Sequence, residues 1–213
     1  MTTFLQPADR GESEYVEKRS RFTGSVWPVE REEEARAKIE ETKRKYYDAR
    51  HNCWCFSLRD GPTRYSDDGE PQGTAGQPIL GVFQGGGITN VCCTVTRYFG
   101  GVLLGTGGLV RAYSAAAKQA LDAADVCEMA QWRQLTLVCT YGQYERVKRL
   151  LEDGGAVVTD TDYAADVTLY ALLREDEADG FPKALADATA GSVRCESGET
   201  CFRGVRIWES NKR

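Results

Sequence analysis

The stretch VCCTVTRYFGGVLLGTGGLVRAY, from Val91 to Tyr113, decides the fold of this chain. Its first residues, Val91 to Thr96, are mostly β-branched or cysteine, which is typical of a strand buried on both faces. It leads into an Ala-rich segment, Leu109 to Leu121, which predicts a helix. The glycines in front of that segment predict a turn, so the stretch indicates a strand, a glycine turn and a helix.

The same stretch predicts an anion-binding loop. Its glycines allow positive φ angles and a close approach of the backbone to a ligand; they are Gly100, Gly101, Gly105, Gly107 and Gly108. The N-terminus of the following helix favours negative charge, and Arg97 and Arg111 are placed to flank an anion in forked geometry. The loop lacks the Lys-Ser/Thr of a Walker A motif and the G-x-G-x-x-G spacing. A glycine-rich connection that only allows close helix–strand packing is the alternative.

Three motifs closely resemble those of the YigZ/Impact family. They are DARHNCWCF at 48–56, SDDGEPQGTAGQPIL at 66–80 and TRYFGGVLLGTGGLVRAYSAAAKQAL at 96–121. Together they extend the resemblance from Ser20 to about Leu121. The remaining residues are similar to the smaller C-terminal domain of the bacterial branch in pattern rather than in a sharp motif.

The resemblance implies the fold class α+β. Residues 1–130 are expected to form an α/β domain like domain 2 of ribosomal protein S5, and residues 131–213 a small ferredoxin-like domain. The pattern of the second half agrees, with the order βαββαβ. Strands are predicted at 134–141, 156–161, 166–173 and 192–205, helices at 143–152 and 175–189, and a linker or trailing turn at 122–131.

In the first half, residues 14–29 predict one or two strands and residues 53–58 another. A helix is predicted at 30–47, with acidic first turns and a basic last turn, and a shorter one at 74–83. Residues 59–71 predict a turn-rich loop. The basic cluster Lys18-Arg19-Ser20-Arg21 is interpreted as a solvated strand edge.

Composition narrows the function. The chain has 213 residues and a formal charge of only -5, so a nucleic-acid site has to be a local patch. The eight cysteines include no C-x-x-C pair and are expected to be reduced, buried side chains. His51 is the only histidine, which excludes metal sites with several imidazoles. Without a secretory signal or a long apolar run, the chain is expected to be cytoplasmic, with no membrane partner.

The main functional prediction is a non-catalytic binding protein that contacts nucleic acid or the ribosome. The resemblance implies translational control, since both domain shapes are similar to domains of elongation factor G, and the Impact branch binds a regulator of the amino-acid-starvation kinase. No cofactor, metal or catalytic residue is predicted, and Tyr98 is expected to stack on a base. The predicted anion or nucleic-acid site consists of Arg50, His51, Arg97, Tyr98, Gly100, Gly101, Thr106, Gly107, Gly108 and Arg111.

Two other functions stay open. Asp67, Asp68 and Glu70 form a carboxylate loop that is able to hold Mg²⁺ in an enzyme acting on a phosphorylated small molecule or nucleotide. The same carboxylates equally often cap the next helix or pair with arginines. The other alternative is a protein–protein adaptor with a regulatory partner in a stress or starvation response.

Overall fold

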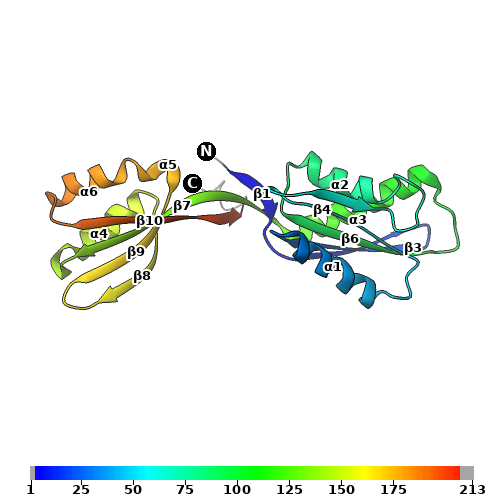
Figure 1. Ribbon diagram of the computed structural model, residues 1–213, viewed down its shortest axis with the longest axis horizontal. Coiled ribbons are helices and arrows are strands. Elements are labelled where there is room, and N and C mark those ends of the chain that lie inside the picture. Colours follow the sequence, from blue (N-terminus) through cyan, green and yellow to red (C-terminus); the bar gives the residue numbers. More distant parts are fainter. Residues whose placement is uncertain (1–2, 207–213) are drawn as a thin grey trace. The chain divides into compact units, whose positions relative to one another are not determined.

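The computed structural model describes residues 3–206 and divides them into two compact units (Figure 1). One unit runs from Phe4 to Glu128 and also takes in the end of the last strand; the other runs from Met129 to Gly204. Each unit contains an antiparallel sheet covered by helices, so the prediction of an α+β fold is confirmed. Within residues 3–206, no helix combines the length and apolar character that a membrane span requires.

The first unit is built on a five-stranded sheet with the order β2-β3-β6-β4-β5. The helix α1 covers one face of this sheet, and α2 and α3 cover the other (Figure 1). The elements of this unit are β1 (Phe4–Pro7), β2 (Gly11–Glu17), β3 (Ser20–Pro28), α1 (Glu32–Lys45), β4 (His51–Ser57), β5 (Thr63–Ser66), α2 (Gly76–Gly85), β6 (Val91–Tyr98) and α3 (Gly105–Ala124). The strand β5 lies within the segment predicted as a loop.

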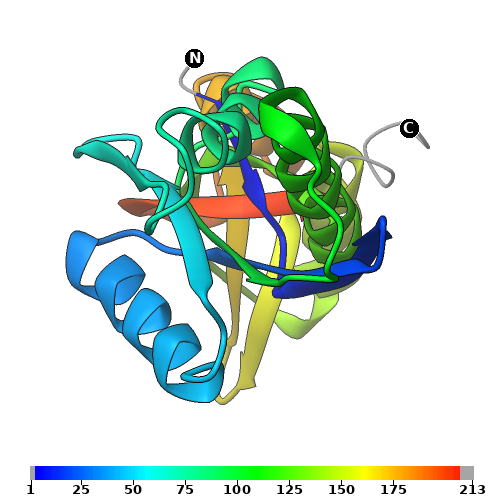
Figure 2. The same cartoon turned by 90° about the vertical axis from the view of Figure 1, so that its right-hand side faces the viewer.

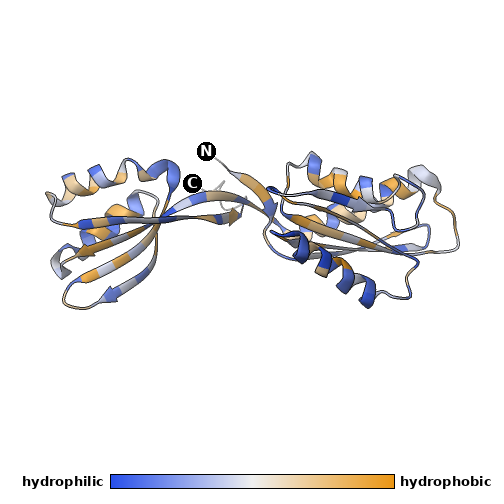
Figure 3. Ribbon diagram, in the orientation of Figure 1, coloured by the Kyte–Doolittle hydropathy of each residue, from blue (hydrophilic) through white to orange (hydrophobic). Residues whose placement is uncertain are grey.

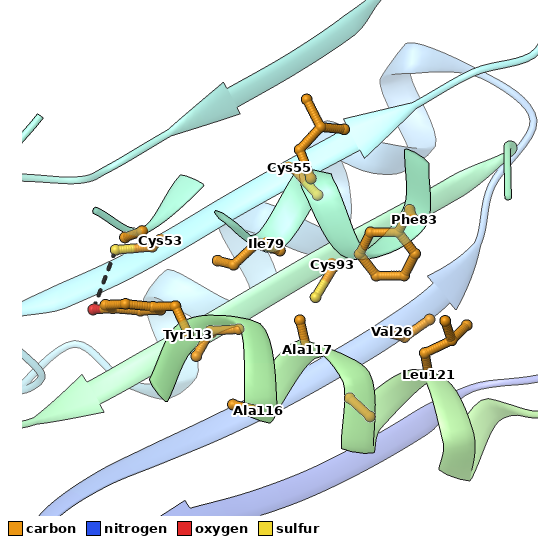
Figure 4. Close-up of a cluster of buried hydrophobic side chains, with 14 of the residues drawn as sticks. Val26, Cys53, Cys55, Ile79, Phe83, Cys93, Tyr113, Ala116, Ala117 and Leu121 are labelled. Atoms are coloured by element: carbon orange, nitrogen blue, oxygen red, sulfur yellow. Dashed lines mark hydrogen bonds between the residues drawn. The ribbon is translucent and has the colours of Figure 1, made fainter. Parts of the chain in front are cut away.

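The central strand β6 is buried on both faces, as its composition predicts. Cys93 and Val95 point into the core under α2 and α3, whereas Cys92 belongs to the core under α1. Figure 4 shows Cys93 packed between β4 and the small side chains of α3, among them Ala116 and Ala117. The alanines let α3 lie close to the sheet, and the cysteines act as small buried hydrophobic side chains.

The helix α1 follows its charge pattern. Glu32 to Glu34 occupy its first turn and Lys43 to Lys45 its last, which complements the helix dipole. The carboxylate of Glu34 accepts the backbone N–H of the N-cap residue Arg31 at 3.3 Å and that of Glu30 before it at 2.8 Å, as in a capping box. In Figure 3 this helix is mainly hydrophilic in colour, consistent with a narrow buried stripe.

The glycine segment differs from the prediction of a turn. The helix α3 begins at Gly105, so Thr106, Gly107 and Gly108 form its first turn. Gly108 and Leu109 are buried, and the packing of this turn against the protein outweighs the low helix propensity of glycine. The turn itself lies earlier, where Gly101 has a φ of 82°.

The second unit has the predicted βαββαβ order, with β10 paired to β7 and the remaining strands in the order β7-β9-β8. Its elements are β7 (Val126–Cys139), α4 (Tyr141–Asp153), β8 (Val157–Tyr163), β9 (Val167–Arg174), α5 (Glu175–Ala178), α6 (Phe181–Thr189) and β10 (Arg194–Arg206). The single helix predicted at 175–189 is two helices, because Gly180 and Pro182 start a new one.

Of the linker or trailing turn predicted at 122–131, only the end of a helix at 122–124 is found, and the rest of the prediction is wrong. The helix α3 continues to Ala124, and β7 starts at Val126 after Asp125, whose φ is 58°. Cys127, Met129 and Ala130 are buried in this part of β7. The composition of this segment does not favour a strand. Its extended conformation is stabilised by pairing with β1 and β10, which lie far away in the sequence.

The buried thiols of the first unit make its stability sensitive to alkaline pH. Burial raises the pKa of Cys55 and Cys93 well above the ordinary value, and raises the pKa of Cys92 to about 12. The unfolded chain releases thiol protons above about pH 8.5, while the folded chain keeps them, so the free energy of unfolding falls as pH rises. We expect the urea midpoint to decrease between pH 7 and about pH 10, with a shallower slope in Cys93→Ala.

The matched control is Ala117→Gly, which weakens the same core and leaves every thiol in place. We expect this variant to be less stable than the wild type at every pH and to keep the wild-type slope. Equal slopes in Cys93→Ala and Ala117→Gly would contradict the assignment of the alkaline effect to the thiols.

Candidate functional site

The ends of three neighbouring strands lie together at one end of the first sheet, and we call this border, which runs across the strands, the edge. In the pairing register Arg21 lies opposite Tyr98, and His51 lies opposite Arg97. The starts of β3 and β4 are therefore at the same edge as the end of β6, and α3 begins just beyond it. Figure 2 shows this unit with that edge turned toward the reader.

The β2–β3 hairpin tip and the glycine loop are packed together at this edge. The amide of Gly100 donates a hydrogen bond to Oγ of Ser20 at 3.1 Å. A Cβ on Gly100 would lie 2.0 Å from the carbonyl carbon of Arg19, so no other residue fits here without a backbone shift. Gly100 therefore joins the loop to the hairpin, and its amide is already used by the protein.

Arg97 lies inside the unit and is paired with a carboxylate. Its Nη1 donates to Oε1 of Glu70 at 2.7 Å, and the two side chains are only 8% and 3% exposed. The guanidinium lies over the rings of Phe22 and Phe99, with Cζ 5.6 Å from each ring centroid. Within residues 3–206, Nε of Arg97 is buried without a hydrogen-bond partner.

The same carboxylate binds a tyrosine of α3. The hydroxyl of Tyr113 donates to Oε1 of Glu70 at 2.8 Å, and the thiol of Cys53 lies 3.4 Å from that hydroxyl (Figure 4). Burial raises the pKa of Tyr113 and of Cys53 well above their ordinary ranges, so both stay protonated. They act as hydrogen-bond donors, and neither has the ionised form that a nucleophile requires.

His51 faces this pair from the edge. Its Nδ1 lies 2.8 Å from the carbonyl oxygen of Asp68, which only accepts hydrogen bonds, so Nδ1 carries the proton. In the neutral ring Nε2 is then free to accept, and it lies 4.0 Å from Oε1 of Glu70. The structure thus brings His51 and Arg97 together around Glu70.

The carboxylate loop is held by the protein's own donors. Asp67 accepts the amides of Ala75 at 3.0 Å and Gly76 at 2.8 Å and so caps α2, while Asp68 accepts the amide of Asn52 at 2.7 Å. Within residues 3–206, no group of three or more His, Cys, Asp or Glu side chains is arranged to hold a metal ion.

Tyr98 points to the opposite face of the sheet from Arg97, because neighbouring residues of a strand alternate. Its hydroxyl donates to Asp48 at 2.7 Å, and the guanidinium of Arg21 lies over its ring at 4.8 Å. Its ring and its hydroxyl are therefore both in use. The structure does not place Tyr98 with the other predicted site residues.

The first turn of α3 is open. Thr106 and Gly107 are exposed there, and the N-cap residue Leu104 makes no side-chain capping bond. Arg111, one turn further on, is exposed, and its Nη1 would lie 3.6 Å from a Cβ on Gly107. Partial burial and a hydrogen bond to Glu17 raise the pKa of Tyr15 on β2, and the nearby guanidinium of Arg111 opposes that shift.

The exposed cations at this edge have no carboxylate within 4.0 Å among residues 3–206, whereas Arg36 and Lys38 of α1 and its N-cap residue Arg31 are ion-paired. We call the exposed side chains here the strand-end surface: Lys18, Arg19, Arg21, Arg50, Phe99 and Arg111. Only Arg50 and Arg111 of this surface belong to the predicted site. The signal for the others was the basic cluster at 18–21, and Phe99 gave none beyond its place beside Tyr98.

Removing one partner of the buried pair should destabilise the protein strongly. Glu70→Leu leaves the guanidinium of Arg97 buried without its counter-charge, and we expect the free energy of unfolding to fall by about 3–5 kcal/mol. The double variant Glu70→Leu with Arg97→Met removes both charges and should recover much of that loss. Urea unfolding measures both, with Glu32→Leu at an exposed pair as the control, expected to cost under about 1 kcal/mol. Equal losses for Glu70→Leu and Glu32→Leu would contradict this role of the buried pair.

Comparison with known proteins adds the family. Residues 18–121 match the Impact N-terminal domain, and residues 137–192 match a domain of unknown function (DUF1949). The chain is 36% identical over 181 residues to the IMPACT family member YigZ of Escherichia coli (strain K12), a match that covers 83% of this chain and 89% of that protein. It is 31% identical over 202 residues to the IMPACT family member YvyE of Bacillus subtilis (strain 168), covering 94% and 93%.

A solved structure described as "Crystal structure of an hypothetical protein" is similar to this chain in sequence and fold. It is 34% identical in sequence and superimposes with a TM-score of 0.59 over 93% of this chain and 98% of the other. Sequence identity and coverage of this extent, in both units of the chain, show common descent. The protein therefore belongs to the IMPACT family.

Proposed function

We propose that this protein binds RNA, free or in the ribosome, through the strand-end surface, and acts by this contact in the cytoplasm on translation. The observation that carries the proposal is the group of five exposed cations without carboxylate partners among residues 3–206: Lys18, Arg19, Arg21, Arg50 and Arg111. Phosphate groups attract such cations and release bound counterions on contact. A local patch of this kind is what an almost neutral first unit needs in order to bind a polyanion.

The neighbouring carboxylates of Glu17 and Asp48 form no ion pair with this patch among residues 3–206. Glu17 accepts a hydrogen bond from the hydroxyl of Tyr15 at 3.1 Å, and Asp48 accepts one from Tyr98 at 2.7 Å. Glu70 is buried against Arg97 and is screened from the surface. These carboxylates are therefore hydrogen-bonded within the protein, and among residues 3–206 the only side-chain contact described for the five cations is that of Arg21 with the ring of Tyr98.

The hairpin tip offers a second argument. Lys18 and Arg19 form its two-residue turn, with φ angles of 46° and 67°. Such turns favour Asn-Gly, because both positions require positive φ. Two long cationic residues in a strained conformation are a feature that function explains better than stability.

A magnesium-dependent reaction receives less support from the geometry. Its proposed ligands Asp67, Asp68 and Glu70 already accept hydrogen bonds from a helix start, a strand amide, an arginine and a tyrosine. The adaptor alternative stays a prediction.

The hairpin allows a test that separates binding from folding. In the variant Lys18→Asn with Arg19→Gly the turn has its preferred residues, so stability should be equal or higher although two cations are removed. We expect the affinity for a labelled oligouridylate at low salt to fall about tenfold or more. The slope of log affinity against log salt should decrease by about 0.7 for each phosphate group that the variant no longer neutralises. Fluorescence anisotropy measures both.

The control is Arg31→Gln with Arg36→Gln, which removes the same charge from α1, where both arginines are paired. We expect this variant to bind nearly as tightly as the wild type. Wild-type affinity and salt slope in the hairpin variant would show that the RNA contact lies elsewhere.

A further inference from the structure

We propose that Phe99 is a stacking platform for an unpaired base, so that the ligand of the strand-end surface is single-stranded rather than double-helical RNA. This inference rests on the proposed function and specifies its substrate class. It begins from Phe99, an exposed aromatic side chain in the loop that is packed against the cationic hairpin tip.

Phe99 is the outer member of a stack that starts in the core. Tyr113 meets Phe22 edge to face at 5.1 Å between ring centroids, and the guanidinium of Arg97 lies 5.6 Å from the centroids of both Phe22 and Phe99. Phe22 is fully buried, whereas Phe99 is 51% exposed. The cation covers one side of the Phe99 ring, and the exposed half remains for a ligand.

The inner members of this stack are held by hydrogen bonds. Arg97 cannot follow a moving ring, because Glu70 holds its Nη1 at 2.7 Å and Tyr113 in turn holds Glu70 at 2.8 Å. A preorganised aromatic side chain loses little conformational entropy on binding. The buried ion pair therefore holds a cation against the inner side of the Phe99 ring.

The surroundings of Phe99 fit a nucleic-acid strand. Val102 and Leu103, which follow it in the loop, are 41% and 82% exposed and extend the apolar contact. Arg19 lies next to this loop through its backbone, and Arg111 lies over the start of α3. An exposed aromatic ring with cations in the segments packed against its loop offers what single strands require, namely stacking for the bases and positive charge for the phosphates.

Tyr98 does not offer the same platform. Arg21 covers its ring, and its hydroxyl is bound to Asp48, so it lies half-buried on the other face of the sheet. In a duplex the bases stack on one another and present no free face. Phe99 should therefore contribute to the binding of single strands only, while the cations contribute to both.

The experiment uses two ligands, single-stranded oligouridylate and the duplex that it forms with oligoadenylate. Fluorescence anisotropy at one low salt concentration measures the affinity of each ligand for the wild type, Phe99→Leu and Phe99→Trp. We expect Phe99→Leu to weaken binding of the single strand about tenfold and to leave binding of the duplex unchanged. Phe99→Trp should retain the wild-type affinity, and its fluorescence should be quenched when the single strand is added. Tyr65→Leu, which removes a 48% exposed tyrosine on β5, is the matched control and should bind both ligands like the wild type.

The outcomes separate this inference from the proposed function. If the wild type binds neither ligand, the proposed function fails. If it binds both and Phe99→Leu keeps its single-strand affinity, or loses affinity for both ligands equally, the stacking inference is overturned while the RNA contact stands. Equal losses of single-strand affinity in Phe99→Leu and Phe99→Trp would also overturn it, because they would indicate a fitted shape rather than an aromatic face. The melting temperature of each variant confirms that it is folded.

Discussion

The buried pair of Arg97 and Glu70 is the interaction on which the first unit of this protein most depends. Moving either charge into the interior is costly unless the other is there to meet it, so the two segments that carry them are held together. Arg97 is the last residue but one of the central strand β6, and Glu70 belongs to the loop before α2. Through Tyr113 the same carboxylate also reaches α3. One polar cluster thus connects the sheet to both helices of one face.

The pairing around Glu70 also affects which charged side chains are exposed at the surface. The carboxylates of the loop at 67–70 are used inside the protein, to cap α2, to hold the start of β4 and to pair with Arg97. Lys18 and Arg19 of the hairpin tip and Arg111 of α3 have no carboxylate within 4.0 Å among residues 3–206. A chain that is slightly acidic overall therefore has a locally basic edge, since its acids and bases are separated in space and not in sequence.

Membership of the IMPACT family agrees with the extent of this edge. The match to the Impact N-terminal domain begins at residue 18, in the hairpin tip, and ends at residue 121, in α3. It includes every residue of the strand-end surface. The second unit has a different character, with eight Lys and Arg against thirteen Asp and Glu in residues 129–204. A polyanion is therefore better matched by the first unit than by the second.

The sequence alone determined the family, the α+β class and most elements of the fold. β6 was predictable because a run of valine, cysteine and threonine has no polar face to expose, and α1 because its charges follow the dipole. The start of β7 within 122–131 and the division of the helix at 175–189 could not be predicted from the sequence. In the first case pairing with distant strands made a strand, and in the second Gly180 and Pro182 divided the helix.

For the candidate site, the sequence located the chain segments but not the roles of their side chains. The sequence identified His51, Arg97 and Arg111 as candidate site residues. It left open whether the carboxylates at 67–70 face the arginines. Only the tertiary structure decided that Glu70 faces Arg97 and not Arg111, that Tyr98 and Arg97 lie on opposite faces, and that Phe99 is exposed beside unpaired cations. The physical reason is that burial and charge pairing depend on neighbours from distant segments, which local pattern and spacing do not record.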